Sequence, residues 1–589
     1  MERRVFIAII LSFLVLYAYQ ALFVGPTPPA AAAKPPAAGA AQSSEAAPAA
    51  ITTTPTTAPA ATPAQAAAAT ATPEPKALVS EPSEREITVD TATVQAVLTN
   101  RGGRLLHWRL KAYRDDRGQP VDLVPSGLPP TEQLPFALRA DDDQATARLN
   151  NAIYRVSGDS GGHVDATRAK GVVSFEYQDA AGIHARKDFR FDPSNYIVAF
   201  SATVTSGDRA MNPTVVWGPG LGDITPAATS GGFFSRSSVV PPGVILHRAG
   251  KVERVAITKV SEQPVQDGQF RFAGVEDHYF MAAVVNPGQA RFEYRPLVIP
   301  GPANTQRQLI SQAVRFPQPP MNVRFFVGPK QFDLLQSIDG EFVRAVNFGM
   351  FGWLAVPLLG ALKWIHGFIG NWGWSIVLLT ILINLAMFPL RHKSVVSMRK
   401  MQALQPQLKA IQDRYANLKV TDPARQKMNT EVMNLYREKG VNPASGCFPM
   451  LLMMPVLFAF YALLGQAIEL RGAEFGWWIK DLSQADPYYV LPVLVAFTMF
   501  WQQKMAPPSA DPTQQKMMMF MPIMFGFIFL TTAAGTALYW FVSNVWMIGQ
   551  QYFTTWFVGP PEVQTVRPAA ERRLKNAGAG RTAGAEKQS

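Results

Sequence analysis

The sequence is constrained most by its long apolar segments that carry no charge. The first covers residues 5–24, which hold no charged side chain and follow Arg3 and Arg4. Twenty helical residues at about 1.5 Å each span the roughly 30 Å hydrocarbon core of a bilayer. The other long apolar segments all follow residue 347. This distribution excludes a wholly soluble protein and a wholly disordered one.

The first apolar segment is predicted to be an uncleaved membrane anchor over residues 1–24, with its N-terminus in the cytoplasm. A cleavable signal peptide is the alternative, because Ala-rich sequence follows, but its apolar region is normally only about 7–15 residues. Residues 25–76 consist almost entirely of Ala, Pro and Thr. Such a segment buries too little to offset its ordering entropy, so we expect a disordered linker.

Alternation of apolar and polar residues marks residues 77–340 and predicts β-strands. No helical pattern of ten residues competes with it before about residue 331. We therefore expect a large β-sandwich on the outer side of the membrane. The clearest apolar alternations are Val94, Ala96 and Leu98, then Leu106, Trp108 and Leu110, then Val173, Phe175 and Tyr177.

The C-terminal part alternates apolar segments with loops. Residues 341–370 are apolar but are interrupted by Pro357, Lys363 and His366, which favours an amphipathic helix lying in the outer interface. Five membrane spans are predicted after it, so the chain with its anchor is expected to have six transmembrane helices. The five spans are about 371–390, 447–466, 488–503, 518–533 and 536–558.

The charges of the loops agree with this arrangement. Residues 391–446 hold 11 Lys and Arg against 4 Asp and Glu, whereas residues 467–487 hold 2 against 4. Basic loops stay on the cytoplasmic side, so the first loop is predicted to be cytoplasmic and the second to lie outside. The basic tail, residues 559–589, is then cytoplasmic as well. We interpret the net charge of +12 first as a signal of membrane topology and only second as a sign of nucleic-acid binding.

The cytoplasmic loop has its own helical pattern. Its first half carries apolar residues at alternating spacings of three and four, as in a coiled-coil seam. Asp422 is a good N-cap with Pro423 at the first helical position, which predicts a second helix. The two helices either bury only each other or leave charged outer faces for a partner. The seam residues are Met401, Leu404, Leu408, Ile411, Tyr415 and Leu418.

Catalytic motifs are absent from the sequence. It contains no phosphate-binding loop, no nucleophile elbow and no His-Glu-x-x-His zinc motif. The single cysteine, Cys447, excludes a disulfide framework. The seven histidines are scattered, and the carboxylates Asp141, Asp142 and Asp143 are expected to form a solvated turn. These features predict that the chain is not an enzyme and needs no cofactor or metal.

The sequence does not favour two other function classes. A secondary transporter or channel usually carries ionisable residues inside its spans, and the predicted spans hold only uncharged polar residues between their ends. A membrane-tethered carbohydrate enzyme carried on the β domain would need clustered acid and base residues, which the scattered histidines do not supply.

Several motifs in the C-terminal half resemble the YidC family of bacterial membrane protein insertases. They follow the family's order and spacing from about residue 341 to 558, and the β domain resembles the family's periplasmic domain, a galactose-mutarotase-like supersandwich. The motifs are NWGWSI at 371–376, MFPL at 387–390, MQALQPQ at 401–407, VNP at 441–443, GCFP at 446–449, DPYY at 486–489, QQK at 514–516, FMP at 520–522, LYW at 538–540 and SN at 543–544.

The resemblance implies an insertase and chaperone that inserts and helps fold nascent integral membrane proteins, alone or with the Sec translocon. In this family a five-helix core, here 371–558, forms a hydrophilic groove that is open to the cytoplasm and to lipid. The implied partners are nascent membrane proteins, the ribosome, the Sec translocon with its accessory subunits, and membrane lipids. The protein is expected to work as a monomer in the bacterial inner membrane, with a periplasmic β domain and both termini cytoplasmic.

The resemblance also assigns roles to individual residues. The client groove is expected to be lined by Thr380, Asn384, Met453, Met454, Thr531, Tyr539 and Trp540. Clients are expected to be received on the helical hairpin 391–440 by Arg399, Lys400, Lys409 and Arg414. The tail is expected to contact the ribosome through Arg572, Arg573 and Lys575, because Lys and Arg are the usual partners of phosphates. The alternative is that the basic tail only determines the membrane topology.

One groove position departs from the family pattern. The family places an arginine on the first core helix where this chain has Asn384, and Met453 stands where a relative can carry Gln. Arg391 is seven residues further on, about 10 Å along a helix axis. We therefore expect a groove that works by hydration and by soft contacts from Met453, Met454 and the aromatic pair Tyr539 and Trp540, rather than by charge.

Overall fold

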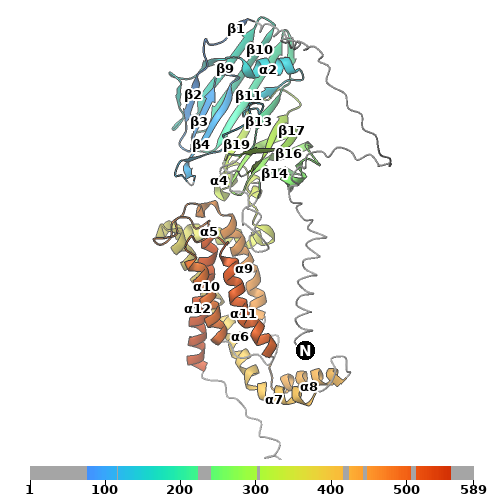
Figure 1. The fold of residues 1–589 in the computed structure, drawn as a ribbon, viewed down its shortest axis with the longest axis vertical. Helices are drawn as coiled ribbons and strands as arrows, with labels where there is room; N and C mark the ends of the chain where they lie inside the picture. The colour runs from blue at the N-terminus through green and yellow to red at the C-terminus, as the bar shows by residue number, and fades with distance from the viewer. Residues whose placement is uncertain are drawn as a thin grey trace, which may run out of the picture. The chain divides into compact units, whose positions relative to one another are not determined.

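The computed structural model describes a β-rich region followed by a helical region (Figure 1). The chain separates into two compact units, residues 1–77 and 78–589. The predicted anchor, nearly all of the predicted linker, and the basic tail with Arg572, Arg573 and Lys575 lie outside the described residues. These are 76–115, 117–222, 241–300, 306–415, 424–441, 448–505 and 512–558.

The β-rich region consists of short and long strands that form two sheets. The strands are β1 (Ala77–Val79), β2 (Glu86–Asp90), β3 (Val94–Thr99), β4 (Arg104–Arg114), β5 (Pro120–Asp122), β6 (Ala137–Arg139), β7 (Arg155–Ser157), β8 (His163–Asp165), β9 (Gly171–Asp179), β10 (Ile183–Phe191), β11 (Ile197–Ser206), β12 (Arg209–Met211), β13 (Thr214–Gly218), β14 (Gly243–Arg248), β15 (Lys251–Ala256), β16 (Val265–Glu276), β17 (Phe280–Pro300), β18 (Gln306–Arg315) and β19 (Val323–Pro329).

The larger sheet has 14 strands and the smaller has five, in the order β5-β4-β3-β2-β8. The main path of the larger sheet is β1-β9-β10-β11-β19-β17-β16-β14-β15, and β13 joins it by pairing with β18. The pairing of β2 with β8 is parallel, whereas neighbours such as β9, β10 and β11 pair antiparallel. The β-sheet-rich domain expected from the alternating sequence is therefore present.

The core of this region is built from the inward face of each strand. Phe136 packs with its ring centroid 5.1 Å from Phe189 and 5.0 Å from Phe200. Lys187 is fully buried beside these rings and donates to the carbonyl oxygens of Gly102 (2.6 Å) and Phe136 (2.7 Å). Burial in this apolar surrounding lowers the pKa of Lys187 well below its ordinary value.

The alternation of buried and exposed residues predicted from the sequence is correct in β9 and wrong in part of β4. Val173 and Phe175 are fully buried, as their alternation predicts. In β4 Leu105 is fully buried, whereas Leu106 is only half-buried. The reason is a β-bulge, because the register between β3 and β4 shifts after Val97. A bulge inserts one residue and so reverses the inward and outward positions beyond it.

Two helices shorter than ten residues also occur before residue 331, and the sequence pattern did not identify them. Helix α2 (Asp143–Asn151) begins in the acidic run that was expected to be a solvated turn. The side chain of Asp142 accepts from the amide of Ala145 at 2.7 Å and caps the helix. Asp141 pairs with Arg315 at 2.7 Å, which lowers the pKa of Asp141. A second short helix in this region is α3 (Ile257–Val260).

The helical region follows β19. Its elements are α4 (Phe332–Ile338), η2 (Phe342–Ala345), η3 (Gly349–Phe351), α5 (Gly352–Ile369), α6 (Trp372–Ala403), α7 (Gln405–Arg414), α8 (Ala424–Glu438), α9 (Phe448–Gln466), η5 (Ile468–Leu470), α10 (Val490–Met505), α11 (Pro512–Phe529) and α12 (Ala534–Val558). Apolar side chains of α5, α6, α9, α10 and α12 share one buried cluster. These elements are the yellow to red helices of Figure 1.

Two helices of the described residues are long and apolar enough to cross a bilayer, at Gly349–Ile369 and Trp372–Met401. Shorter apolar helices occur at Met454–Gln466 and Met518–Phe529. The first of these four includes α5, which we predicted to lie in the interface. Helix α6 continues through Pro389 to Ala403, beyond the end predicted for that span at about residue 390.

The predicted hairpin consists of α7 and α8 in the described residues. Leu404 and Ile411 of the predicted seam are buried. The hydroxyl of Tyr415 donates to Glu431 of α8 at 2.7 Å, so polar contacts join the two helices as well as apolar ones. The predicted cap at Asp422 and Pro423 lies outside the described residues.

Candidate functional site

A line of polar side chains runs along one face of α6. Thr380 and Asn384 are buried, with 0% and 1% of their surface exposed. The hydroxyl of Thr380 donates to the carbonyl oxygen of Ile376 (2.6 Å), and Nδ2 of Asn384 donates to that of Thr380 (2.7 Å). These backward bonds to the preceding turn satisfy polar groups inside an apolar helix. They leave Oδ1 of Asn384 to accept from another group.

Arg391 supplies that group. Its Nη1 donates to Oδ1 of Asn384 at 2.9 Å, across nearly two helical turns. Arg391 reaches Asn384 although it lies seven residues further along the helix, because its long side chain folds back along the helix. A guanidinium has five N–H donors, and this contact uses one of them. We call Thr380, Asn384 and Arg391 the polar stripe.

The aromatic residues predicted for the groove lie on α12. Tyr539 is buried and stacks on Phe460 of α9, with ring centroids 4.5 Å apart. It lies within electrostatic range of Arg391, so α12 contributes to the surroundings of the polar stripe. Trp540 packs instead against Phe525 of α11 at 5.8 Å.

The other predicted groove residues are less closely associated with the stripe. Met454, at the start of the apolar part of α9, is 39% exposed. Thr531 is exposed in the turn between α11 and α12, where its hydroxyl donates to the carbonyl oxygen of Ile528. The side chain of Met453 lies outside the described residues. The structure thus brings Thr380, Asn384 and Tyr539 into the buried interior and leaves Met454 and Thr531 at the surface.

A second polar contact joins α10 to α12. Nδ2 of Asn544 donates to the hydroxyl of Thr498 at 3.2 Å, and both residues are buried. The Thr498 hydroxyl in turn donates to the carbonyl oxygen of Leu494 at 2.7 Å. Such bonds hold helices together in membranes, so this pair has a structural explanation that needs no client.

The basic residues assigned to client reception differ in their surroundings. Arg399, near the end of α6, donates to the carbonyl oxygen of Thr554 and to the hydroxyl of Thr555 on α12. Arg414 pairs with Glu431 at 3.0 Å and joins α7 to α8. Lys400 and Lys409 are exposed. Two of the four residues therefore also have contacts that stabilise the hairpin and its junction with α12.

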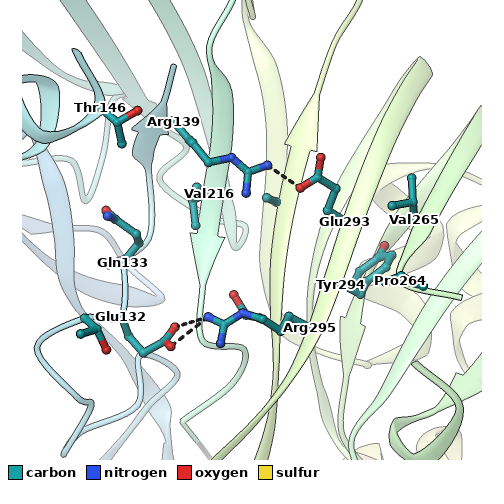
Figure 2. A pocket seen from close by; sticks show the side chains of 13 residues that line it. Glu132, Gln133, Arg139, Thr146, Val216, Pro264, Val265, Glu293, Tyr294 and Arg295 are labelled. Atoms are coloured by element: carbon teal, nitrogen blue, oxygen red, sulfur yellow. Dashed lines mark hydrogen bonds and ion pairs between the residues drawn. The ribbon is translucent and has the colours of Figure 1, made fainter. Parts of the chain in front are cut away.

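The β-rich region contains a pocket of about 340 Å³ (Figure 2). Arg295 donates to both carboxylate oxygens of Glu132 at 2.8 Å, and Arg139 pairs with Glu293 across the pocket. Both carboxylates of this pocket are therefore paired with arginines. In the described part of the chain, no group of three or more His, Cys, Asp or Glu side chains is arranged to hold a metal ion.

Comparison with known proteins links both regions to one family. Residues 86–361 match the family model for the YidC periplasmic domain, and residues 364–558 match that for the 60Kd inner membrane protein. The chain is 33% identical over 94% of its length to the membrane protein insertase YidC of Geobacter metallireducens, covering 98% of that protein.

One further relative and one solved structure are also similar to this chain. The chain is 32% identical to the membrane protein insertase YidC of Syntrophus aciditrophicus, covering 94% of this chain and 99% of that protein. Among solved structures, an active YidC insertase with its first transmembrane domain resolved covers 81% of this chain and 94% of its own, with 18% sequence identity and a TM-score of 0.34.

Proposed function

Because the chain belongs to the YidC family of membrane protein insertases, we propose that its clients enter the membrane along the polar stripe of α6. The family is not a known class of enzymes, and its members act on nascent membrane proteins. The contact that supports this path is the bond from Arg391 to Asn384, which brings a positive charge and a buried amide together inside an apolar helix.

The physical problem that an insertase solves is the passage of polar groups through hydrocarbon. A charge at the centre of a bilayer costs several kcal/mol or more, and each unpaired backbone group adds to the cost. A polar stripe that holds water and offers donors shortens the apolar path that a client's polar end must cross. Burial of the client's own apolar residues, at about 25 cal/mol per Å², then drives insertion without a nucleotide.

The charge of Arg391 gives the stripe a preference among clients. Its guanidinium is half-buried and close to Tyr539, so it attracts an acidic client segment more strongly than an exposed lysine does. The stripe therefore works by charge as well as by hydration. This replaces the purely uncharged groove expected from Asn384 alone.

The proposal includes six membrane spans, with both chain ends and the hairpin 391–440 in the cytoplasm. It is supported by the 11 basic and 4 acidic residues of 391–446 and by the positive-inside rule. Helix α10 has 16 residues, about 24 Å of helix, so the bilayer beside it is thinned. The β domain is a periplasmic supersandwich, and α5 lies in the outer interface.

The proposed partners follow from the same arrangement. The exposed Lys400 and Lys409 meet clients as they leave the ribosome, which the basic tail contacts. The protein acts as a monomer, alone or with the Sec translocon and its accessory subunits.

The test is complementation in a bacterium depleted of its own insertase. Insertion of a small Sec-independent client is followed by its accessibility to protease. Wild type is expected to restore insertion, and Asn384→Leu, which removes the acceptor of Arg391, is expected to restore much less. Normal insertion by Asn384→Leu at equal membrane levels would contradict a role for the polar stripe. No rescue by wild type or by Asn384→Arg would contradict the proposed activity.

A further inference from the structure

A groove on the surface of the α6–α12 pair has no role in the insertion path described above. It encloses about 390 Å³, and its lining is almost entirely apolar. Ile381 and Phe388 contribute from α6, and Val542 and Phe553 from α12. On α12 the groove runs from Val542 to Phe553, eleven positions further on, which is about 16 Å of helix. That length matches one leaflet, half of the roughly 30 Å hydrocarbon core.

One buried amide interrupts this apolar lining. Gln550 is 7% exposed, and within the described residues neither its Nε2 nor its Oε1 has a hydrogen-bond partner. Nε1 of Trp546, one turn away, has no partner in the same part of the chain. Buried polar groups without partners cost about 1–3 kcal/mol each. Both residues line the groove, so an occupant that accepts hydrogen bonds at this depth would remove the cost.

One end of the groove is basic. The ring of Phe388 stacks on His392, and Nδ1 of His392 lies 3.5 Å from the hydroxyl of Thr554. Arg399 reaches the same turn of α12, where it donates to the carbonyl oxygen of Thr554. Helix α6 carries no acidic residue along its whole length, so this end offers positive charge to a ligand.

We propose that this groove binds an anionic phospholipid. The phosphate lies at the basic end near His392 and Arg399. The glycerol ester oxygens accept from Gln550, which precedes Thr554 by four residues, or about 6 Å of helix. One acyl chain continues along Phe388 and Val542. The order of charge, hydrogen-bond donor and apolar wall along the groove is the order of these groups in a phospholipid.

A transmembrane helix of a partner protein fits these features less well. It would cover the apolar wall, but its main-chain groups are already paired within the helix and would leave Gln550 without an acceptor. A neutral phospholipid satisfies the amide and the apolar wall but makes no use of the basic end. The selectivity for negative charge therefore separates the proposed ligand from the alternatives.

The groove can be blocked by a single substitution. A Cβ atom added at Gly549, which lines the groove, meets no atom within 4 Å. Gly549→Leu therefore fills the space without a clash at Cβ. Gly360→Leu is the matched control, because Gly360 on α5 is also helical and open but lies outside the groove lining.

The experiment uses the full chain in nanodiscs of phosphatidylcholine that contain a trace of a photoreactive lipid. The probe is phosphatidylglycerol with a diazirine on its acyl chain, or phosphatidylcholine with the same chain, and adducts are mapped by mass spectrometry. Wild type is expected to form at least fivefold more phosphatidylglycerol adducts than phosphatidylcholine adducts on residues 542–553, a difference of about 1 kcal/mol. Gly549→Leu is expected to lose these adducts, and Gly360→Leu to keep them.

Three outcomes would overturn the proposal. They are equal labelling by the two lipids, unchanged labelling of a folded Gly549→Leu protein, and cross-linking of the groove to a second protein chain. If Gly549→Leu does not fold, competition on wild type decides: unlabelled phosphatidylglycerol must displace the probe, and unlabelled phosphatidylcholine must not. Arg399→Gln is expected to reduce the preference for phosphatidylglycerol while acyl-chain adducts remain.

Discussion

Replacing Arg391 by Gln removes the charge of the polar stripe and the donor to Asn384, whose Oδ1 lies 2.9 Å from Nη1 of Arg391. A client carboxylate about 4 Å from this guanidinium gains about 4 kcal/mol at an effective dielectric constant of about 20. Because Arg391 is only half-buried, water reduces this to about 1.4–2 kcal/mol, which is roughly 10- to 30-fold in rate. We expect the insertion of a client with an acidic tail to slow by that factor.

The assay is insertion of matched clients into vesicles that contain the purified protein, followed by protease protection over time. A client with a neutral tail is expected to insert at nearly the wild-type rate. Lys393→Gln is the control, since it removes the same charge from an exposed side chain two residues away on α6. The double variant Asn384→Arg with Arg391→Asn returns a charge to the stripe and is expected to restore insertion. Equal slowing by Lys393→Gln, or no slowing by Arg391→Gln, would show that the charge of Arg391 does not attract the client.

Three further predictions concern stability. His278 contacts the carbonyl oxygen of Gly465 at 2.8 Å, and burial lowers the pKa of His278 from 6.5 to about 4. Between these pH values the unfolded chain therefore binds more protons than the folded chain. The free energy of unfolding is expected to fall by up to about 3 kcal/mol as the pH drops from 6.5 to 4. Lys187→Met should cost about 2–4 kcal/mol, because buried carbonyl oxygens lose their donor. Gly373→Ala should cost about 1–3 kcal/mol by overpacking, since its Cβ would lie 2.8 Å from that of Phe475.

Thermal and denaturant unfolding of the full chain measure all three changes. In the His278→Gln variant the loss of stability between pH 6.5 and 4 should be smaller, and an unchanged pH profile would contradict the assignment to His278. A Lys187→Met protein as stable as wild type would show that the buried ammonium contributes no net stability. Gly360→Ala is the control for Gly373→Ala, because its Cβ meets no atom within 4 Å; an equal loss in both would exclude overpacking as the cause.

The broad organisation could be predicted because two patterns are strong in the sequence. The period-two alternation identified strands such as β9, and long uncharged segments identified α6 and α12. Details that depend on one residue could not be predicted in this way. The bulge after Val97 reversed the phase of Leu106, and the cap at Asp142 was hidden within a run of three carboxylates.

The candidate site was predicted in part for a similar reason. Thr380 and Asn384 were found because polar residues are rare in apolar helices, and both are buried. The contact between Arg391 and Asn384 could not be predicted from distance along the helix axis, because the Arg391 side chain reaches back across nearly two turns. A long cation near the end of an apolar helix, with an amide seven residues earlier, is the signal that could have identified the contact.

Cross-linking from the client can show whether clients pass along the polar stripe. A ribosome-bound nascent membrane segment with one photoreactive residue is presented to the full protein in vesicles, and the modified peptides are identified. Adducts are expected on α6 between Thr380 and Arg391, with fewer in Arg391→Gln than in Lys393→Gln. Adducts confined to other surfaces, or an identical pattern in both variants, would contradict passage along the polar stripe.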